Sequence, residues 1–131
     1  MILFLRGFFI VVLASMLSVT TWASLKGSVF AIPREVTSHP WFIATLFDTY
    51  WAFFTFYVWL AYKETAWIAR VLWFIAIVLL GNIAMAIYGL IQVFRVPVEA
   101  PLDLVLLRNR PVSSAVPAGL VALIVAIGLF A

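Results

Sequence analysis

The chain has 131 residues, of which 67% are hydrophobic and 10% are charged, and its formal net charge is +3. Soluble domains are about 45–50% apolar and about 25% charged, and a short chain has too much surface per volume to bury the excess. The composition therefore excludes an ordinary soluble domain. It predicts a single transmembrane domain over residues 1–131, with the lipid bilayer as its solvent.

The residue types also exclude several kinds of site. Without cysteine the chain cannot form disulfides, iron–sulfur clusters or cysteine-bound zinc, and its lone histidine, His39, does not build a metal site by itself. The basic residues are scattered singly, so no basic stripe follows a phosphate backbone. We expect no metal, no cofactor and no nucleic-acid partner.

Long apolar runs predict membrane-spanning helices, because about 20 apolar residues cross a bilayer and only a helix satisfies the backbone there. The runs suggest helices at about 7–25, 41–62, 68–94 and 115–131. Pro117 shortens the last run, so its crossing stays open. The predicted fold is an all-α integral membrane protein, an antiparallel bundle of three or four transmembrane helices.

The first run also has features of a secretory signal peptide. Arg6 precedes the apolar stretch, and Thr21-Trp22-Ala23 resembles a cleavage site. The stretch is longer than a usual signal core, however, and Trp22 fits a cleavage site poorly. We therefore expect this run to stay in the protein as a transmembrane helix.

The connections predict how the helices start and turn. Ser38 or His39 is expected to cap the second helix, with Pro40 in its first turn. Lys63-Glu64-Thr65 is so short that the second and third helices must form an antiparallel hairpin, with a solvated turn and Thr65 as the next cap. After the proline-rich segment 96–101, residues near 102–109 predict a short helix on the membrane surface.

The orientation depends on how the positive charges divide between the two sides. Alternating spans place four charges on one side, namely the N-terminal amine, Arg6, Lys63 and Arg70, and five on the other, namely Lys26, Arg34, Arg95, Arg108 and Arg110. That division is too even for the positive-inside rule. Arg6 before the first helix favours a cytoplasmic N-terminus.

Asp48 is the most informative polar residue, because a carboxylate within a span costs about 2.5–3.5 kcal/mol. It shares a face with Thr45 and Thr55 at helical spacing, and we expect that face to point into the bundle. The predicted hairpin places Asn82 at the same depth, with Tyr88 as a second partner. These residues form a predicted intramembrane polar cluster.

The sequence also resembles a known family. The run from Leu46 to Thr65, followed by Ala69–Phe74 and Leu79–Ala86, is similar to small multi-pass bacterial inner-membrane proteins catalogued only as a domain of unknown function. The likeness covers about residues 1–110, with Trp22-Ala23-Ser24 and Phe94-Arg95-Val96-Pro97 included. It implies a core of three helices and no established activity, so residues 111–131 are then a C-terminal extension.

Three functional hypotheses follow. The first is a non-enzymatic structural or accessory subunit, in a membrane complex or a homo-oligomer, whose partners are other membrane helices. The second is a small proton- or cation-coupled transporter that uses Asp48. The third is a protein that binds a lipid, quinone or carotenoid among its aromatic residues. No nucleophile–base pair or phosphate-binding loop is evident, so we do not expect an enzyme.

Overall fold

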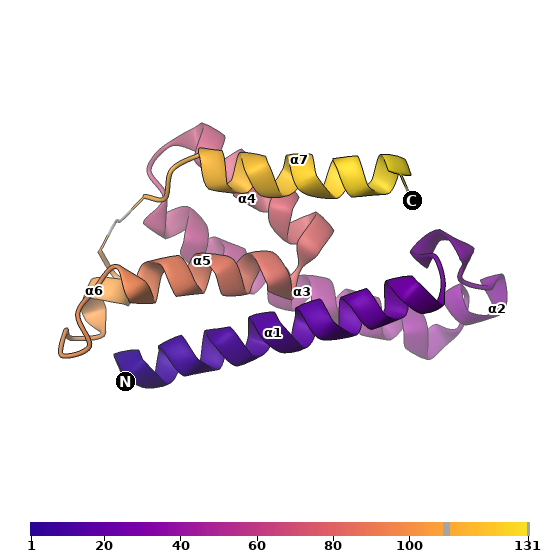
Figure 1. Cartoon of the computed structure of the whole chain (residues 1–131), viewed down its shortest axis with the longest axis horizontal. Helices are drawn as coiled ribbons and strands as arrows, with labels where there is room; N and C mark the ends of the chain where they lie inside the picture. Colours follow the sequence, from indigo (N-terminus) through magenta and orange to yellow (C-terminus); the bar gives the residue numbers. More distant parts are fainter. Residues whose placement is uncertain (109–110, 131) are drawn as a thin grey trace.

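The computed structural model describes residues 1–108 and 111–130, and over these residues it consists of helices and their connections (Figure 1). The helices in chain order are α1 (Ile2–Lys26), η1 (Val29–Ala31), α2 (Arg34–Thr37), α3 (Pro40–Lys63), α4 (Trp67–Leu80), α5 (Asn82–Phe94), α6 (Asp103–Leu106) and α7 (Ala115–Phe130). The all-helical fold that the composition predicts is therefore confirmed.

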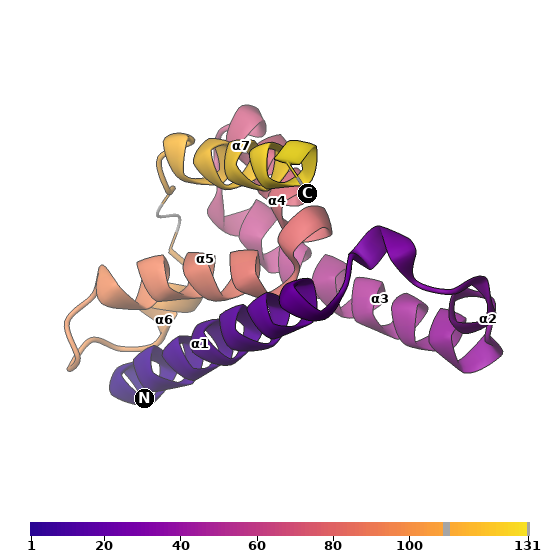
Figure 2. The same ribbon diagram turned by 45° about the vertical axis from the view of Figure 1, so that its right-hand side comes forward.

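The long helices run between two ends of an elongated molecule. α1 leads from the N-terminal end to the end that carries η1 and α2, and α3 returns from there (Figures 1 and 2). α5 lies along α1, and α7 lies along α4. The connections after α3 and after α5 both lie at the N-terminal end, together with α6.

Local chemistry explains where α3 begins. The His39 side chain accepts a hydrogen bond from the backbone N–H of Trp41 at 3.3 Å, and Pro40 is the first helical residue, where its missing N–H costs nothing. Both features were expected. The predicted cap at Thr65 is wrong, because α4 begins one residue later with Ala66 at its N-cap and without a side-chain cap.

α3 and α4 form the expected antiparallel hairpin. The Tyr50 hydroxyl donates to the carbonyl of Val78 at 3.2 Å, and the Tyr57 hydroxyl donates to the carbonyl of Arg70 at 3.0 Å. These two bonds join residues on either side of the 63–66 connection at matching distances along the two helices. The short connection therefore sets the register, as the sequence indicates.

The single helix predicted over residues 68–94 is wrong, because Gly81 divides it into α4 and α5. Gly81 has a φ of +54°, and a Cβ atom there would lie 2.6 Å from the Phe53 ring. Only glycine fits such a backbone conformation at such close approach. The chain turns back at this point, and α5 returns to the end where α4 began (Figure 1).

The main core forms where α3, α4 and α5 meet. Leu60, Trp73, Ile77 and Tyr88 are buried there, and the Trp73 and Tyr88 rings meet edge to face with their centroids 5.0 Å apart. A smaller cluster of Ile2, Val93, Val96 and Val105 closes the N-terminal end. The C-terminal half of α1 and the first half of α3 are mostly exposed.

The length and composition of each helix indicate whether it could cross a membrane. Of the described helices, α1 alone combines the length and the apolar composition needed to cross a membrane, and signal sequences near an N-terminus share these properties. α6 is shorter than the predicted surface helix, whose last residue, Asn109, lies outside the described residues. α7 begins at Ala115 as predicted, and Ala131 also lies outside the described residues.

Candidate functional site

The predicted polar face of α3 exists, but it points outward. Thr45, Asp48, Ala52 and Thr55 follow one another at steps of three and four residues, and all four are exposed. The opposite face of the helix, with Phe53 and Leu60, is the one that packs into the core. The expectation that the acidic face points into this chain's own bundle is therefore wrong.

The structure does not join Asp48 to its predicted partners. Within the described part of the chain, no hydrogen bond links Asp48 to Asn82 or to Tyr88, and Asn82 is itself exposed at the start of α5. The hydroxyls of Thr45 and Thr55 donate to carbonyls of their own helix, those of Trp41 at 2.8 Å and Trp51 at 2.9 Å. Each hydroxyl is thus satisfied locally, without a second helix.

Tyr88 is buried, and it belongs to a different polar cluster. Its hydroxyl donates to Oε1 of Glu64 at 3.1 Å, and the backbone N–H of Val112 donates to the same oxygen at 3.0 Å. Both Glu64 and its neighbour Lys63 have no solvent exposure. The solvated turn predicted at Lys63-Glu64-Thr65 is therefore wrong for its two charged residues.

The burial of this turn follows from the direction of α5. Because α5 returns to the end where α4 began, the chain after it must pass over the α3–α4 connection. We call the described residues 97–108 and 111–114, which include α6, the α6 segment. Its backbone supplies partners for the two charges: the Val105 carbonyl accepts from Lys63 Nζ, and the Val112 N–H donates to Glu64.

Further side chains attach the α6 segment to the long helices. Trp59 Nε1 donates to the carbonyl of Leu106 at 2.9 Å, and a guanidinium nitrogen of Arg95 donates to the carbonyl of Pro111 at 3.0 Å. Beside these bonds, Arg70 Nε donates to the backbone carbonyl of Glu64 at 2.9 Å, which ties the first turn of α4 to the connection after α3. Nearly all of these bonds pair a charged or aromatic side chain with a backbone group. Such bonds hold segments of the chain in place, so we assign them a structural role.

Oε2 of Glu64 and Nε1 of Trp73 are buried here without a hydrogen bond among the described residues. One is an acceptor and the other a donor, and both belong to side chains that touch Tyr88. The described residues contain no group of three or more histidine, cysteine, aspartate or glutamate side chains that could hold a metal ion. The cluster thus offers hydrogen bonding, and no metal-ligand set is visible in it.

Sequence reasoning found one member of this cluster, Tyr88, and assigned it the wrong acid. Glu64 was predicted to be solvated, because an acidic residue in a three-residue connection between apolar runs is normally exposed to water. Its burial depends on the turn at Gly81 and on the later α6 segment, which are far from it in sequence. No local pattern at residues 63–65 could have indicated it.

Comparison with known proteins identifies the family. No curated protein and no solved structure matches the chain. The model of a family described as "Protein of unknown function (DUF1475)" matches residues 1–113, which is most of the chain and ends just before α7. This match confirms the resemblance to an uncharacterised family, and the chain belongs to the DUF1475 family of proteins of unknown function.

Proposed function

We propose that this chain is a non-enzymatic multi-pass membrane protein that packs against other membrane helices, as an accessory subunit of a complex or as a homo-oligomer. In keeping with its sequence resemblance, we place it in the bacterial inner membrane. α1 and α3 have 25 and 24 residues, or about 37 and 36 Å, which exceeds the hydrocarbon thickness of about 30 Å.

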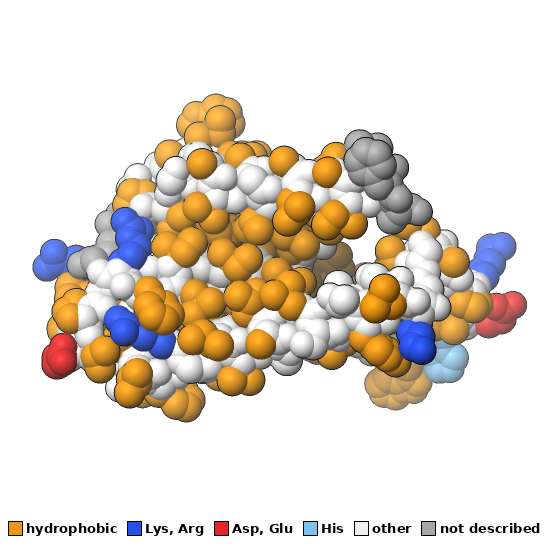
Figure 3. All heavy atoms as spheres, viewed as in Figure 1, with side chains coloured by type: hydrophobic (Ala, Val, Ile, Leu, Met, Phe, Trp, Pro, Cys, Tyr) orange, Lys and Arg blue, Asp and Glu red, His pale blue; other side chains and the backbone are white. Residues whose placement is uncertain are grey.

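The distribution of charge supports a membrane position. In Figure 3 the charged side chains gather towards the two ends of the long axis, and hydrophobic side chains are spread over the surface between them. The exposed large hydrophobic residues include Phe8, Val19, Phe47 and Trp51 on α1 and α3. Monomeric soluble proteins rarely expose an apolar surface of this extent.

The exposure of Asp48 is the observation that carries the proposal of a helix partner. The residue lies eight positions after Pro40, or about 12 Å along α3, on a face with Thr45 and Thr55. A carboxylate facing lipid at this depth costs about 2.5–3.5 kcal/mol. A polar helix face of a second subunit would remove that cost, which is why we expect a partner at this stripe.

Single-cysteine cross-linking in native membranes tests this proposal, since the natural chain has no cysteine. Ala52→Cys lies on the polar stripe, while Val58→Cys lies on the same helix, is also exposed and points to a different side. We expect Ala52→Cys to form a covalent dimer, or an adduct with a partner, at least several times faster than Val58→Cys. Equal yields at the two positions would refute a partner on this face.

A substitution pair at Asp48 separates a packing role from proton transport. If Asp48 only holds a partner, Asp48→Asn keeps the association, while Asp48→Leu weakens it at least threefold. Leucine removes an interhelical hydrogen bond worth about 0.6 kcal/mol, and it also removes the cost of the unpaired carboxylate that association relieves. A proton carrier would instead lose its function in Asp48→Asn although the assembly persists. Sedimentation in detergent measures the association, and proton release on reconstitution measures transport.

The transporter hypothesis has less support than the packing hypothesis. A proton or cation path needs further polar groups along the membrane normal, and Asp48 has no hydrogen bond to Asn82 or Tyr88 in the described part of the chain. The buried Glu64–Tyr88 pair lies at the N-terminal end of the molecule and its bonds hold the α6 segment. A subunit role requires neither a path nor a substrate site.

A further inference from the structure

An apolar pocket of about 190 Å³ lies at the N-terminal end of the molecule and is partly open to the surface. Its walls come from α1, α3, α5 and α6, and it is lined by Leu5, Phe9, Phe56, Trp59, Gly89, Val93, Val105 and Leu106. Two of these lining residues are joined directly, because Trp59 Nε1 donates to the Leu106 carbonyl at 2.9 Å. The lining side chains therefore offer hydrocarbon and aromatic contacts and no charge.

Gly89 shapes one wall of this pocket. A Cβ atom at Gly89 would lie 2.6 Å from the Phe9 ring, so the glycine lets α1 approach α5 closely at this level. The α6 segment forms the opposite wall, fixed there by Trp59 and by the bond from Lys63 to the Val105 carbonyl. The pocket is thus built from helices held together by specific contacts.

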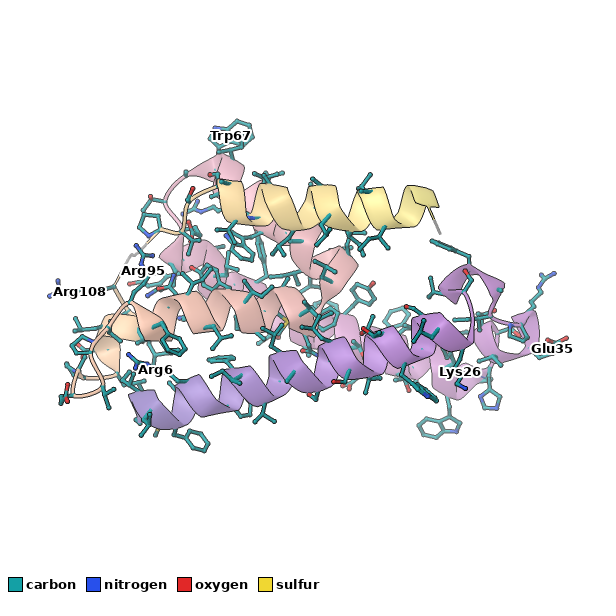
Figure 4. The ribbon with its side chains drawn as sticks, in the orientation of Figure 1. Arg6, Lys26, Glu35, Trp67, Arg95 and Arg108 are labelled. Carbon is teal, nitrogen blue, oxygen red and sulfur yellow. The ribbon has the colours of Figure 1, made fainter. Side chains whose placement is uncertain are left out.

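Cationic side chains stand next to the lining residues. The Arg6 guanidinium donates to the carbonyls of Val93 at 3.3 Å and Val96 at 2.7 Å, and it lies 4.6 Å from the centre of the Phe94 ring. Arg95 and Arg108 lie at the same end of the molecule (Figure 4). The acidic groups exposed on this end are Glu99 and Asp103 on the α6 segment, fewer than the cations.

We propose that this pocket binds one acyl chain of an anionic phospholipid, whose phosphate group lies beside Arg6. The inference rests on the membrane location proposed above. A volume of about 190 Å³ is below the range of about 300–1,000 Å³ typical of small-molecule sites, so part of an alkyl chain fits better than a quinone or carotenoid. Arginine binds phosphate well because its planar guanidinium presents several donors, of which Arg6 uses only some for the two carbonyls.

Native mass spectrometry of the full chain, reconstituted and then released in mild detergent, tests the proposal with phosphatidylglycerol and phosphatidylcholine of identical acyl chains. We expect wild-type protein to keep one phosphatidylglycerol molecule at least fivefold more often than phosphatidylcholine. Leu106→Trp fills the pocket from α6 and should reduce retention at least fivefold. Leu107→Trp adds the same bulk on an exposed neighbour outside the pocket and should bind as wild type does.

Arg6 variants test the headgroup separately. Arg6→Gln should lower phosphatidylglycerol retention to the phosphatidylcholine level, and Arg6→Lys should restore part of the preference because it keeps the charge. Arg34→Gln, at the other end of the molecule, serves as the matched control. Circular dichroism checks that each variant is folded. If Leu106→Trp unfolds, Leu5→Trp replaces it as the pocket-filling variant, since Leu5 lines the pocket from α1. If Arg6→Gln unfolds, Arg6→Lys tests the headgroup in its place.

Two results would overturn the proposal. Equal retention of the two lipids by the wild-type protein would show that the site does not recognise an anionic headgroup. Equal binding by Leu106→Trp and Leu107→Trp would show that the lipid does not occupy the pocket. Either result leaves the cross-linking of Ala52→Cys unaffected, so the subunit proposal would still stand. Release of the wild-type protein from membranes by carbonate would instead contradict the membrane location on which both proposals rest.

Discussion

Glu64 holds together parts of the chain that are far apart in sequence, because one carboxylate oxygen accepts from both the Tyr88 hydroxyl and the Val112 N–H. Glu64→Ala would leave both donors buried without an acceptor, and each costs about 1–3 kcal/mol. We therefore expect Glu64→Ala to lower the unfolding free energy by about 2–5 kcal/mol, measured by denaturant titration in detergent micelles.

Two further variants give this prediction its control. Glu64→Gln keeps an acceptor oxygen, so its loss should be clearly smaller than that of Glu64→Ala. Glu35→Ala changes an exposed acid at the opposite end of the molecule and should alter stability by less than about 0.5 kcal/mol. A Glu64→Ala protein as stable as Glu35→Ala would show that the cluster does not fasten the α6 segment.

At the scale of the helices, Gly81 determines the path of the chain. Its φ of +54° is unfavourable for other residues, and a Cβ would meet the Phe53 ring at 2.6 Å. We expect Gly81→Ala to destabilise the protein by about 2–4 kcal/mol, as backbone strain and overpacking each cost about 1–3 kcal/mol. Thermal unfolding followed by circular dichroism measures the loss.

The control for Gly81 is a glycine inside a helix with open space around it. Gly119 in α7 has nothing within 4 Å of its ideal Cβ, so Gly119→Ala should be neutral or stabilise by up to about 1 kcal/mol. Adding Phe53→Leu to Gly81→Ala should recover the steric part of the loss and leave the part due to φ. If Gly81→Ala behaves as Gly119→Ala does, the turn between α4 and α5 is not as described.

At the scale of the whole molecule, the turn at Gly81 changes how the charges divide between the two ends. If every predicted helix crossed the membrane in turn, Arg95 and Arg108 would lie at the same end of the molecule as Lys26 and Arg34. The structure places them instead at the end that carries Arg6 (Figure 4). The described basic residues at the N-terminal end are Arg6, Lys63, Arg70, Arg95 and Arg108, while the other end carries Lys26 and Arg34. Arg110 lies outside the described residues.

This distribution predicts the orientation in the proposed membrane. The end richer in lysine and arginine faces the cytoplasm under the positive-inside rule, so the loop with η1 and α2 faces the outside. Labelling of single-cysteine variants measures this orientation. In intact cells a membrane-impermeant maleimide should label Thr37→Cys, whereas Glu99→Cys should be labelled only after the cells are lysed. The reverse pattern would contradict the orientation, and labelling of both sites in intact cells would contradict a sealed membrane position.

Local sequence determined much of this protein. Apolar runs indicated the positions of α1, α3 and α7, although α1 begins at Ile2, before its predicted start near residue 7. His39 and Pro40 indicated the start of α3, and the short connection at Lys63–Thr65 indicated the α3–α4 hairpin. These features depend on neighbouring residues, since helix formation, capping and tight turns are set within a few positions. The family resemblance was equally readable from continuous segments.

The tertiary structure alone decided which polar residues are buried. Asp48 points outward because the opposite face of α3 carries the aromatic contacts to α4, and Glu64 is buried because α5 turns back at Gly81 and brings the α6 segment over it. A left-handed glycine in an apolar run looks the same in sequence as a tolerated helical glycine. The burial of a residue depends on the path of remote segments, which local hydropathy does not contain.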